Sequence, residues 1–345
     1  MAEENKLLWA NDLRATATIA VILLHAAASE NRLFDATASI DTGIVLLYNA
    51  MCRWSVPVFV MLTGSFALDN YNGNLKLFFS KVFKRIFLPF LFWSTVYFLV
   101  NDGAFVMDVN NSLQDKMTLL WQRLLSGTAV HLWFVYMIFG MYLLIPFVSK
   151  WVKYCTNKEK VFFILLWSVF LFVAPLIEKG GYDISFDYSY FSGYIGYLVI
   201  GNFLLKENKR MNNRVYWFLL IGTILFSFAI TYFLSYKDHK INETFFENLS
   251  PNVALMSVSI YLLFKNVRIA MPSIGRKCLD IICTNSYGIF LIHILILTIV
   301  RHLPVNFLLL PVLIRIPLTT LLCLFVSVTI IILLRKIPYL KFLVG

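Results

Sequence analysis

Long apolar runs recur from one end of the chain to the other, separated by shorter polar segments. A helix needs about 20 apolar residues to cross the roughly 30 Å of hydrocarbon in a bilayer. Ten segments approach this length, although the third and eighth are short and the tenth is long. They are residues 8–28, 44–68, 86–101, 131–149, 161–177, 189–205, 215–235, 251–266, 282–300 and 308–334. The pattern predicts an all-α fold, a polytopic integral membrane helix bundle with about ten transmembrane helices.

The composition argues against a soluble protein. The 345 residues are 59% hydrophobic, 17% aromatic and only 14% charged, and the mean hydropathy is +0.74. Soluble globular domains contain about 25% charged residues. Because the apolar runs continue throughout, we expect a single membrane domain over residues 1–345. The first run contains charges and no small-residue cleavage site, so we expect a retained helix rather than a cleaved signal peptide.

The basic residues indicate how the helices are oriented. Under the ten-helix assignment, 20 of the 30 Lys and Arg residues fall on one side of the membrane and seven on the other. The positive-inside rule therefore predicts that both termini are cytoplasmic. We attribute the formal net charge of +11 to this topology and to contact with membrane lipids, not to nucleic-acid binding.

The cysteines and histidines give no sign of a disulfide or a metal. None of the five cysteines falls in an outer loop, so no structural disulfide is expected. No Cys-x-x-Cys pair and no His/Cys cluster has the spacing of metal ligands, so no metal site is expected. The oligomeric state is not fixed by the sequence.

A longer outer segment, residues 102–130, contains the stretch "DKMTLLWQRLLSG". Its apolar residues recur at helical spacing and predict an amphipathic helix. Two interpretations stay open, a helix that lies on the outer membrane surface and a lid over an outward-facing cleft. The apolar positions are Met117, Leu120, Trp121, Leu124 and Leu125.

The first apolar run, "DLRATATIAVILLH", contains Asp12, Arg14 and His25. Arg14 and His25 are eleven residues apart, which places them within about 20° of the same helix face and about 16 Å apart along the axis. A charged side chain within the bilayer costs about 2.5 kcal/mol or more unless it faces the protein interior. Such residues are therefore functional candidates. The alternatives are that Arg14 snorkels to the headgroups with Asp12 as its partner, and that His25 is a neutral packing residue.

Two further spans contain polar residues near their outer ends. In "NAMCRWSVPVFVMLTG", Arg53 stands about a third of the way in from the outer side, and Pro57 breaks the helix. Arg53 is too deep for snorkelling and suits an anion or a polar acceptor. His131 and Trp133 open the fourth span at the outer interface, where an aromatic belt alone accounts for the tryptophan.

The ninth span contains "NSYGIFLIH", with Ser286 and Tyr287 at its cytoplasmic end and His293 near mid-membrane. Ser286 and His293 are two turns apart, too far along the axis for a Ser–His pair. Buried histidines and arginines with a basic cytoplasmic edge suggest a path for an anionic or activated molecule that enters from the cytoplasm. A histidine with an unperturbed pKa of about 6.5 is suited to act as a general base on an attacking hydroxyl.

Together these stretches resemble acyltransferase family 3, the integral-membrane O-acyltransferases. Arg14 and His25 match the spacing of the family's first-helix signature. The other landmarks follow in order, and the likeness spans nearly the whole chain. They are "VPVFVMLTGSFAL" in the second helix, "KVFKRIFLP" at the basic third-helix entrance, "HLWFVYMIFGMYLLIP" in the centre and "SYGIFLIH" late in the chain.

The resemblance implies transfer of an acyl group, usually acetyl, from cytoplasmic acyl-CoA to a hydroxyl of a cell-surface polysaccharide or lipid-linked glycan precursor. It implies His25 as the catalytic histidine and Arg14 as its partner, and we add Asp12 to the candidate catalytic residues. The family's R-x-x-R entrance is represented here by Lys81 and Lys84, with Arg85 adjacent, and lysine still serves a phosphate as a point charge. Acetyl-CoA is expected as a donor co-substrate, without a permanently bound cofactor.

The sequence-based hypothesis is that His25 deprotonates the acceptor hydroxyl for direct attack on the thioester, in a bacterial plasma (inner) membrane protein. A covalent acyl-histidine intermediate is the less favoured version. The rival function is a polysaccharide or lipid-linked sugar exporter, and a structural membrane subunit leaves the buried polar residues unexplained. The candidate donor- or acceptor-binding residues are Arg53, Lys81, Lys84, Arg85, His131, Trp133, Ser286, Tyr287 and His293.

Overall fold

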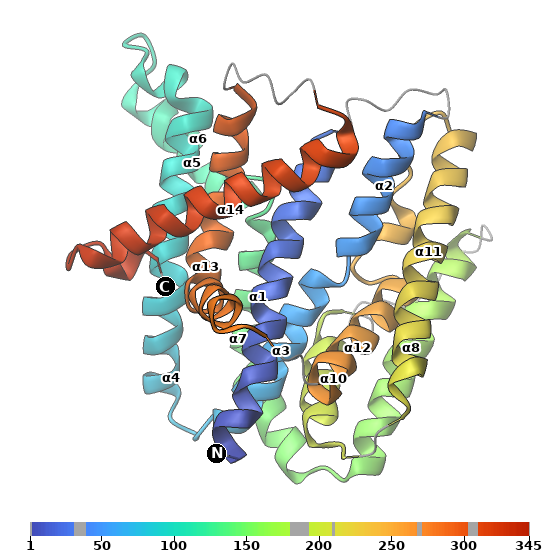
Figure 1. The fold of residues 1–345 in the computed structure, drawn as a ribbon. Helices are drawn as coiled ribbons and strands as arrows, with labels where there is room; N and C mark the ends of the chain where they lie inside the picture. The colour runs from blue at the N-terminus through green and yellow to red at the C-terminus, as the bar shows by residue number, and fades with distance from the viewer. Residues whose placement is uncertain are drawn as a thin grey trace. The chain divides into compact units, whose positions relative to one another are not determined.

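The computed structural model describes residues 2–30, 39–179, 193–208, 211–267, 271–302 and 310–344. Within these residues every regular element is a helix, which confirms the all-α prediction (Figure 1). The ends of two predicted spans, at residues 189–192 and 308–309, lie outside the described residues.

Contacts divide the chain into two compact units, which are described separately. Unit 1 comprises Met1–Tyr71, Ile145–Thr284 and Pro304–Leu322, and unit 2 comprises Asn72–Leu144, Asn285–Leu303 and Cys323–Gly345. Three helices contribute to both units: α7 (Trp133–Tyr154), α13 (Ser273–His302) and α14 (Val312–Lys336). The expectation of a single domain stays a prediction.

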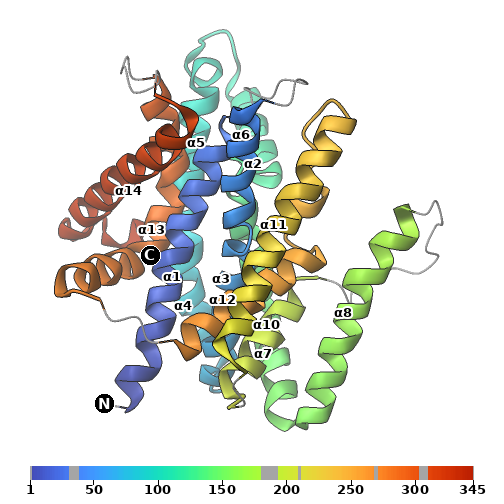
Figure 2. The same cartoon turned by 45° about the vertical axis from the view of Figure 1, so that its right-hand side comes forward.

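Unit 1 contains most of the helices. In Figures 1 and 2, α11 runs alongside α12, and both lie in this unit. Its own elements are α1 (Ala2–Ala28), α2 (Ile40–Cys52), α3 (Ser55–Asn70), α8 (Asn157–Lys179), α10 (Ile195–Lys206), α11 (Asn213–Lys237), η3 (Thr244–Phe246) and α12 (Pro251–Asn266).

Unit 2 is built around α5 and the unit 2 parts of α7, α13 and α14. A π-helical turn, η2, joins α4 to α5 without a break in the helical path. The tryptophan of α5 at position 93 donates its indole N–H to the carbonyl of Leu343, which ties the last turn of the described chain to this helix. Its elements are α4 (Leu75–Val82), η2 (Phe83–Phe87), α5 (Leu88–Met107), α6 (Leu113–Ser126) and η5 (Lys341–Leu343).

Six helical segments among the described residues are long and apolar enough to cross a membrane. They are Ile40–Asn70, Leu75–Met107, Trp133–Tyr154, Asn213–Lys237, Ser273–His302 and Val312–Lys336. The remaining predicted spans correspond to helices that are shorter, such as α10 and α12, or that contain charges, such as α1. A multi-pass membrane protein is therefore supported, while the count of about ten and the sides of the termini stay predictions.

The predicted span 44–68 is two helices, α2 and α3, that meet at Arg53 and Trp54. Pro57 explains the break, because it has no N–H to donate to the carbonyl four residues earlier, that of Arg53. Side chains satisfy other carbonyls at the junction. Trp54 donates its indole N–H to Met51 at 2.7 Å, and Ser55 donates its hydroxyl to Cys52 at 2.7 Å.

A close helix crossing in unit 1 joins α3 to α10. A Cβ atom on Gly64 would overlap the backbone of Leu198, and a Cβ atom on Gly201 would overlap the backbone of Met61. The hydroxyl of Ser65 donates across the crossing to the carbonyl of Gly201 at 2.9 Å. Small residues let two backbones approach within membranes, where dispersion and hydrogen bonds replace the hydrophobic effect as the force that holds helices together.

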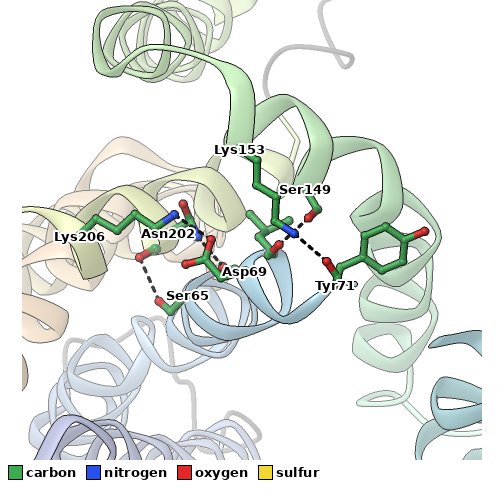
Figure 3. Close-up of polar contacts among 10 residues, drawn as sticks. Ser65, Asp69, Tyr71, Ser149, Lys153, Asn202 and Lys206 are labelled. Atoms are coloured by element: carbon green, nitrogen blue, oxygen red, sulfur yellow. Dashed lines mark hydrogen bonds and ion pairs between the residues drawn. The ribbon is translucent and has the colours of Figure 1, made fainter. Parts of the chain in front are cut away.

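Polar side chains also secure the C-terminal end of α3 (Figure 3). Lys153 of α7 donates to the carbonyl of Tyr71 at 2.7 Å, and Lys206 of α10 pairs with Asp69 at 2.7 Å. Ser149, one turn before Lys153, donates to Leu68. Cations and donors are favourable at helix C-termini because the last carbonyls lack intrahelical partners. Lys153 and Lys206 therefore stabilise the fold itself.

The predicted amphipathic helix of the outer segment is α6. Ser112 and Asp115 form a capping box at its start, and the side chain of Arg123 pairs with Asp102 of α5 at 2.7 Å. One apolar stripe at four-residue spacing is exposed and does not pack on the helices of unit 2. Its residues are Leu113, Met117, Trp121 and Leu125.

Candidate functional site

Asp12, at the start of the first-helix signature, contacts α13. Asp12 forms an ion pair with Arg276, in which the two side chains are 12% and 28% exposed. The sequence suggested Arg14 as the partner of Asp12, and the structure instead gives Asp12 to a residue 264 positions away. Asp12 thus serves to join α1 to the start of α13 in unit 1.

Arg14 lies half-buried on α1 and its side chain contacts the thiol of Cys283 on α13. No carboxylate lies within ion-pair distance of Arg14 among the side chains that the structure describes. Its guanidinium is therefore suited to an anionic or strongly polar ligand.

His25 is half-buried near the C-terminal end of α1, on the same face as Arg14. The end of this helix is fixed by a second ion pair that the sequence did not suggest. Glu30 pairs with Arg315 of α14 at 3.0 Å, and the two side chains are only 8% and 11% exposed. The segment that contains Arg14 and His25 is thus joined at both ends to other helices of unit 1.

Arg53 is engaged by the chain's own outer segment. Its guanidinium donates to the carbonyl of Phe246 at 3.1 Å, lies 4.5 Å from the centre of that residue's ring, and pairs with Glu243 at 3.4 Å. Its side chain is 13% exposed. These contacts explain a deep arginine without a ligand, so its predicted acceptor-binding role receives no support from its surroundings.

We expect Arg53→Ala to destabilise the folded protein by about 1–3 kcal/mol, because it removes a charged hydrogen bond and a cation–π contact from a largely buried site. Thermal unfolding of the detergent-solubilised protein measures the effect. The control is Arg123→Ala, whose pair with Asp102 is exposed at the arginine and should contribute less than about 1 kcal/mol. Equal losses of stability in the two variants would contradict the assignment.

Unit 2 brings together two histidines from distant parts of the sequence. His131 and His293 are 1% and 0% exposed, and their ring centres are 4.9 Å apart in an edge-on arrangement. The ring of Tyr97 lies 5.2 Å from that of His131. The sequence placed these histidines on separate spans, and nothing in the spacing indicated that their faces meet. Trp133, two residues after His131, is 41% exposed, and its place in an aromatic belt stays a prediction.

Backbone carbonyls orient both rings. Nε2 of His131 lies 3.3 Å from the carbonyl of Leu291, and Nδ1 of His293 lies 2.6 Å from that of Phe290. A nitrogen that faces a carbonyl is the protonated one, which assigns the tautomer of each neutral ring. The two rings are therefore fixed side by side in the interior of unit 2.

The basic third-helix entrance forms a cationic face in unit 2, which we define as Lys81, Lys84 and Arg85. All three side chains are exposed, and no carboxylate pairs with them among the described residues. Their spacing of three and four residues places them on one side of the helix. Lys84 and Arg85 lie in the π-helical turn, and Tyr287 of α13 donates its hydroxyl to Ile86 of that turn at 2.8 Å.

The sequence profile of a family described as an acyltransferase domain matches residues 7–336, nearly the whole chain. The chain belongs to acyltransferase family 3. No curated protein and no solved structure gives a significant match. The family and the six apolar helical segments together support a multi-pass membrane acyltransferase.

The positions that match the acyltransferase family's motifs fall in both units. Arg14 and His25 belong to unit 1, whereas the cationic face, the histidine pair and Tyr287 belong to unit 2. Ser286 is half-buried beside Tyr287 and stays a predicted binding residue. The described part of this acyltransferase contains no group of three or more His, Cys, Asp or Glu side chains arranged for a metal ion.

Proposed function

We propose that the protein is an O-acetyltransferase of the bacterial inner membrane. It moves an acetyl group from cytoplasmic acetyl-CoA to a hydroxyl of a surface polysaccharide or a lipid-linked glycan precursor. Membership of an acyltransferase family supports acyl transfer, and the apolar helices support a membrane location. The acetyl group, the CoA donor and the glycan acceptor are proposed here in addition to acyl transfer.

The observation that carries the proposal is the state of Arg14. This arginine lies on the same face of α1 as His25, and Asp12, the nearest carboxylate in sequence, is paired with Arg276. A charge kept inside a membrane bundle without a carboxylate partner is costly, which makes it a functional candidate. An exporter has no comparable need for a cation and a base in line on one helix.

In the proposed reaction, His25 accepts the proton of the acceptor hydroxyl as the hydroxyl oxygen attacks the thioester carbonyl. The tetrahedral intermediate then expels CoA, whose sulfur takes the proton back from the histidinium. Arg14 supports the donor through charge-assisted hydrogen bonds, and the phosphates of CoA bind the cationic face. The histidine pair in unit 2 is proposed to bind the acceptor, because it places two polar rings side by side in an apolar interior.

Transfer of radiolabel from acetyl-CoA into the envelope glycan fraction tests the proposal directly. We expect membranes that contain the protein to incorporate label and membranes that lack it to incorporate none. Incorporation should scale with the amount of folded protein. Absence of label in both samples, together with loss of glycan export in a deletion strain, would favour the exporter instead.

Replacement of Arg14 tests the residue that supports the proposal. We expect Arg14→Gln to lower kcat/KM for acetyl-CoA by about 10- to 100-fold, the loss of a charged hydrogen bond of about 1.5–3 kcal/mol. The measurement is the steady-state rate against acetyl-CoA concentration at matched protein abundance. Lys206→Gln is the control, because it removes an exposed cation of unit 1 that pairs with Asp69. Similar small effects in both variants would remove Arg14 from the site.

A further inference from the structure

The geometry points to Tyr287 as a positioning residue for the acyl-CoA donor, through the π-helical turn that carries Lys84 and Arg85. This inference rests on the proposed function. Tyr287 does not itself belong to the cationic face. Its hydroxyl donates to the carbonyl of Ile86, at 2.8 Å, from the opposite helix α13. We propose that this hydrogen bond holds the turn in the orientation that presents both cations to the phosphates of the donor.

The turn depends on support from outside its own helix. The N–H of Leu88 donates to Phe83, five residues earlier, which is the π-helical pattern. The next residue, Pro89, has no N–H to continue the ladder. A hydroxyl that donates to Ile86 therefore stabilises the backbone at the point where the regular hydrogen bonds of the helix are interrupted.

Packing fixes both partners of this hydrogen bond. The ring of Phe87, in the turn, lies 5.4 Å from that of Phe139 on α7. On α13, Gly288 follows Tyr287 so closely packed that a Cβ atom there would lie 3.0 Å from Ile331 and 3.1 Å from the carbonyl of Val344. With α13 and the apolar side of the turn both held, the hydroxyl of Tyr287 defines how the turn is rotated about its axis.

The cationic face is suited to bind an anion, and two sources offer phosphate. Three exposed cations on one side of a helix, with no carboxylate paired to them among the described residues, repel one another. Both the phosphates of acyl-CoA and those of lipid headgroups relieve that repulsion. A π-helical turn departs from regular α-helix geometry and often occurs at functional sites. Contact with lipid headgroups needs no particular backbone conformation. This difference favours the donor.

Tyr287→Phe removes only the hydroxyl, and two donors separate a positioning role from general destabilisation. S-acetylpantetheine carries the same thioester as acetyl-CoA but no phosphate. In phosphatidylcholine nanodiscs, we expect the full-length variant to show a KM for acetyl-CoA raised by about two- to tenfold, the range that one hydrogen bond supplies. Its kcat should stay within about twofold, and its kinetics with S-acetylpantetheine should match those of the wild type.

Two comparisons complete the test. Tyr136→Phe, which removes another tyrosine hydroxyl bonded to a backbone carbonyl of unit 2, should leave KM for acetyl-CoA unchanged. On a Lys84→Gln, Arg85→Gln background, Tyr287→Phe should have no further effect, because a residue that acts through the cations is coupled to them.

Several results would overturn the inference while leaving the proposed function intact. They are an unchanged KM, an equal loss with both donors, additive effects on the Lys84→Gln, Arg85→Gln background, or an effect that requires anionic lipid in the nanodisc. The last would assign the cationic face to headgroups. If the wild-type protein transfers acetyl from neither donor, the proposed function itself fails, and the inference fails with it.

Discussion

Replacing His25 with alanine is expected to lower acetyl transfer by about 100- to 10,000-fold, the contribution of a general base in a positioned site. His25 is the only histidine of α1 and shares a helix face with Arg14. Without it, the acceptor hydroxyl has no side chain in the proposed position to take its proton. The measurement is label transfer from acetyl-CoA into envelope glycan, normalised to the amount of folded protein.

Two control variants separate the chemistry from the fold. His302→Ala removes an exposed histidine at the end of α13 and should transfer normally. The His25→Ala protein should retain its thermal unfolding midpoint, because the ion pairs at both ends of the segment, Asp12–Arg276 and Glu30–Arg315, do not involve His25. Normal transfer by His25→Ala at normal abundance would exclude the general-base role.

The sequence predicted those features of the structure that depend on a single helix. The register between Arg14 and His25 follows from helical periodicity alone, and the bounds of α12 agree with the predicted span 251–266. The break near Pro57 follows from a missing N–H. Each of these features is local, so a single segment of sequence contains all the information that it requires.

The sequence did not predict which helix faces meet. Asp12 pairs with Arg276, and His131 packs against His293, across separations at which hydropathy carries no information. A membrane-spanning helix is apolar on nearly every side, so the spacing of its apolar residues does not show which face is buried. Where two backbones approach closely, as at Gly64 and Gly201, the crossing is set by the small residues and not by an apolar stripe.

The same distinction applies to the charged residues. Arg53 is predicted to bind a ligand because of its place within an apolar span, and Phe246 and Glu243 of its own chain contact its guanidinium. Arg14 lies half-buried on α1, and no carboxylate pairs with it among the described residues. Position within an apolar span therefore marks both arginines as costly, and the structure adds that one is paired with a carboxylate of its own chain whereas the other is not.

Gly201→Ala is expected to destabilise unit 1 by about 3 kcal/mol or more, because overpacking of this kind requires the backbone to move. The added methyl group would overlap the backbone of Met61 on α3, where no side chain is able to rotate away. Separation of α3 from α10 also lengthens the hydrogen bond from Ser65 to the carbonyl of Gly201. The measurement is the yield and thermal unfolding midpoint of the detergent-solubilised protein.

Gly222→Ala is the matched control, since Gly222 also lies within a helix, α11, and a Cβ atom there would meet nothing within 4 Å. Alanine is a better helix former than glycine by about 1 kcal/mol, so this variant should be as stable as the wild type or more so. The two substitutions add the same methyl group to the same backbone conformation and differ only in what surrounds it. Equal stability of the two variants would mean that α3 and α10 do not cross at Gly201 in the membrane.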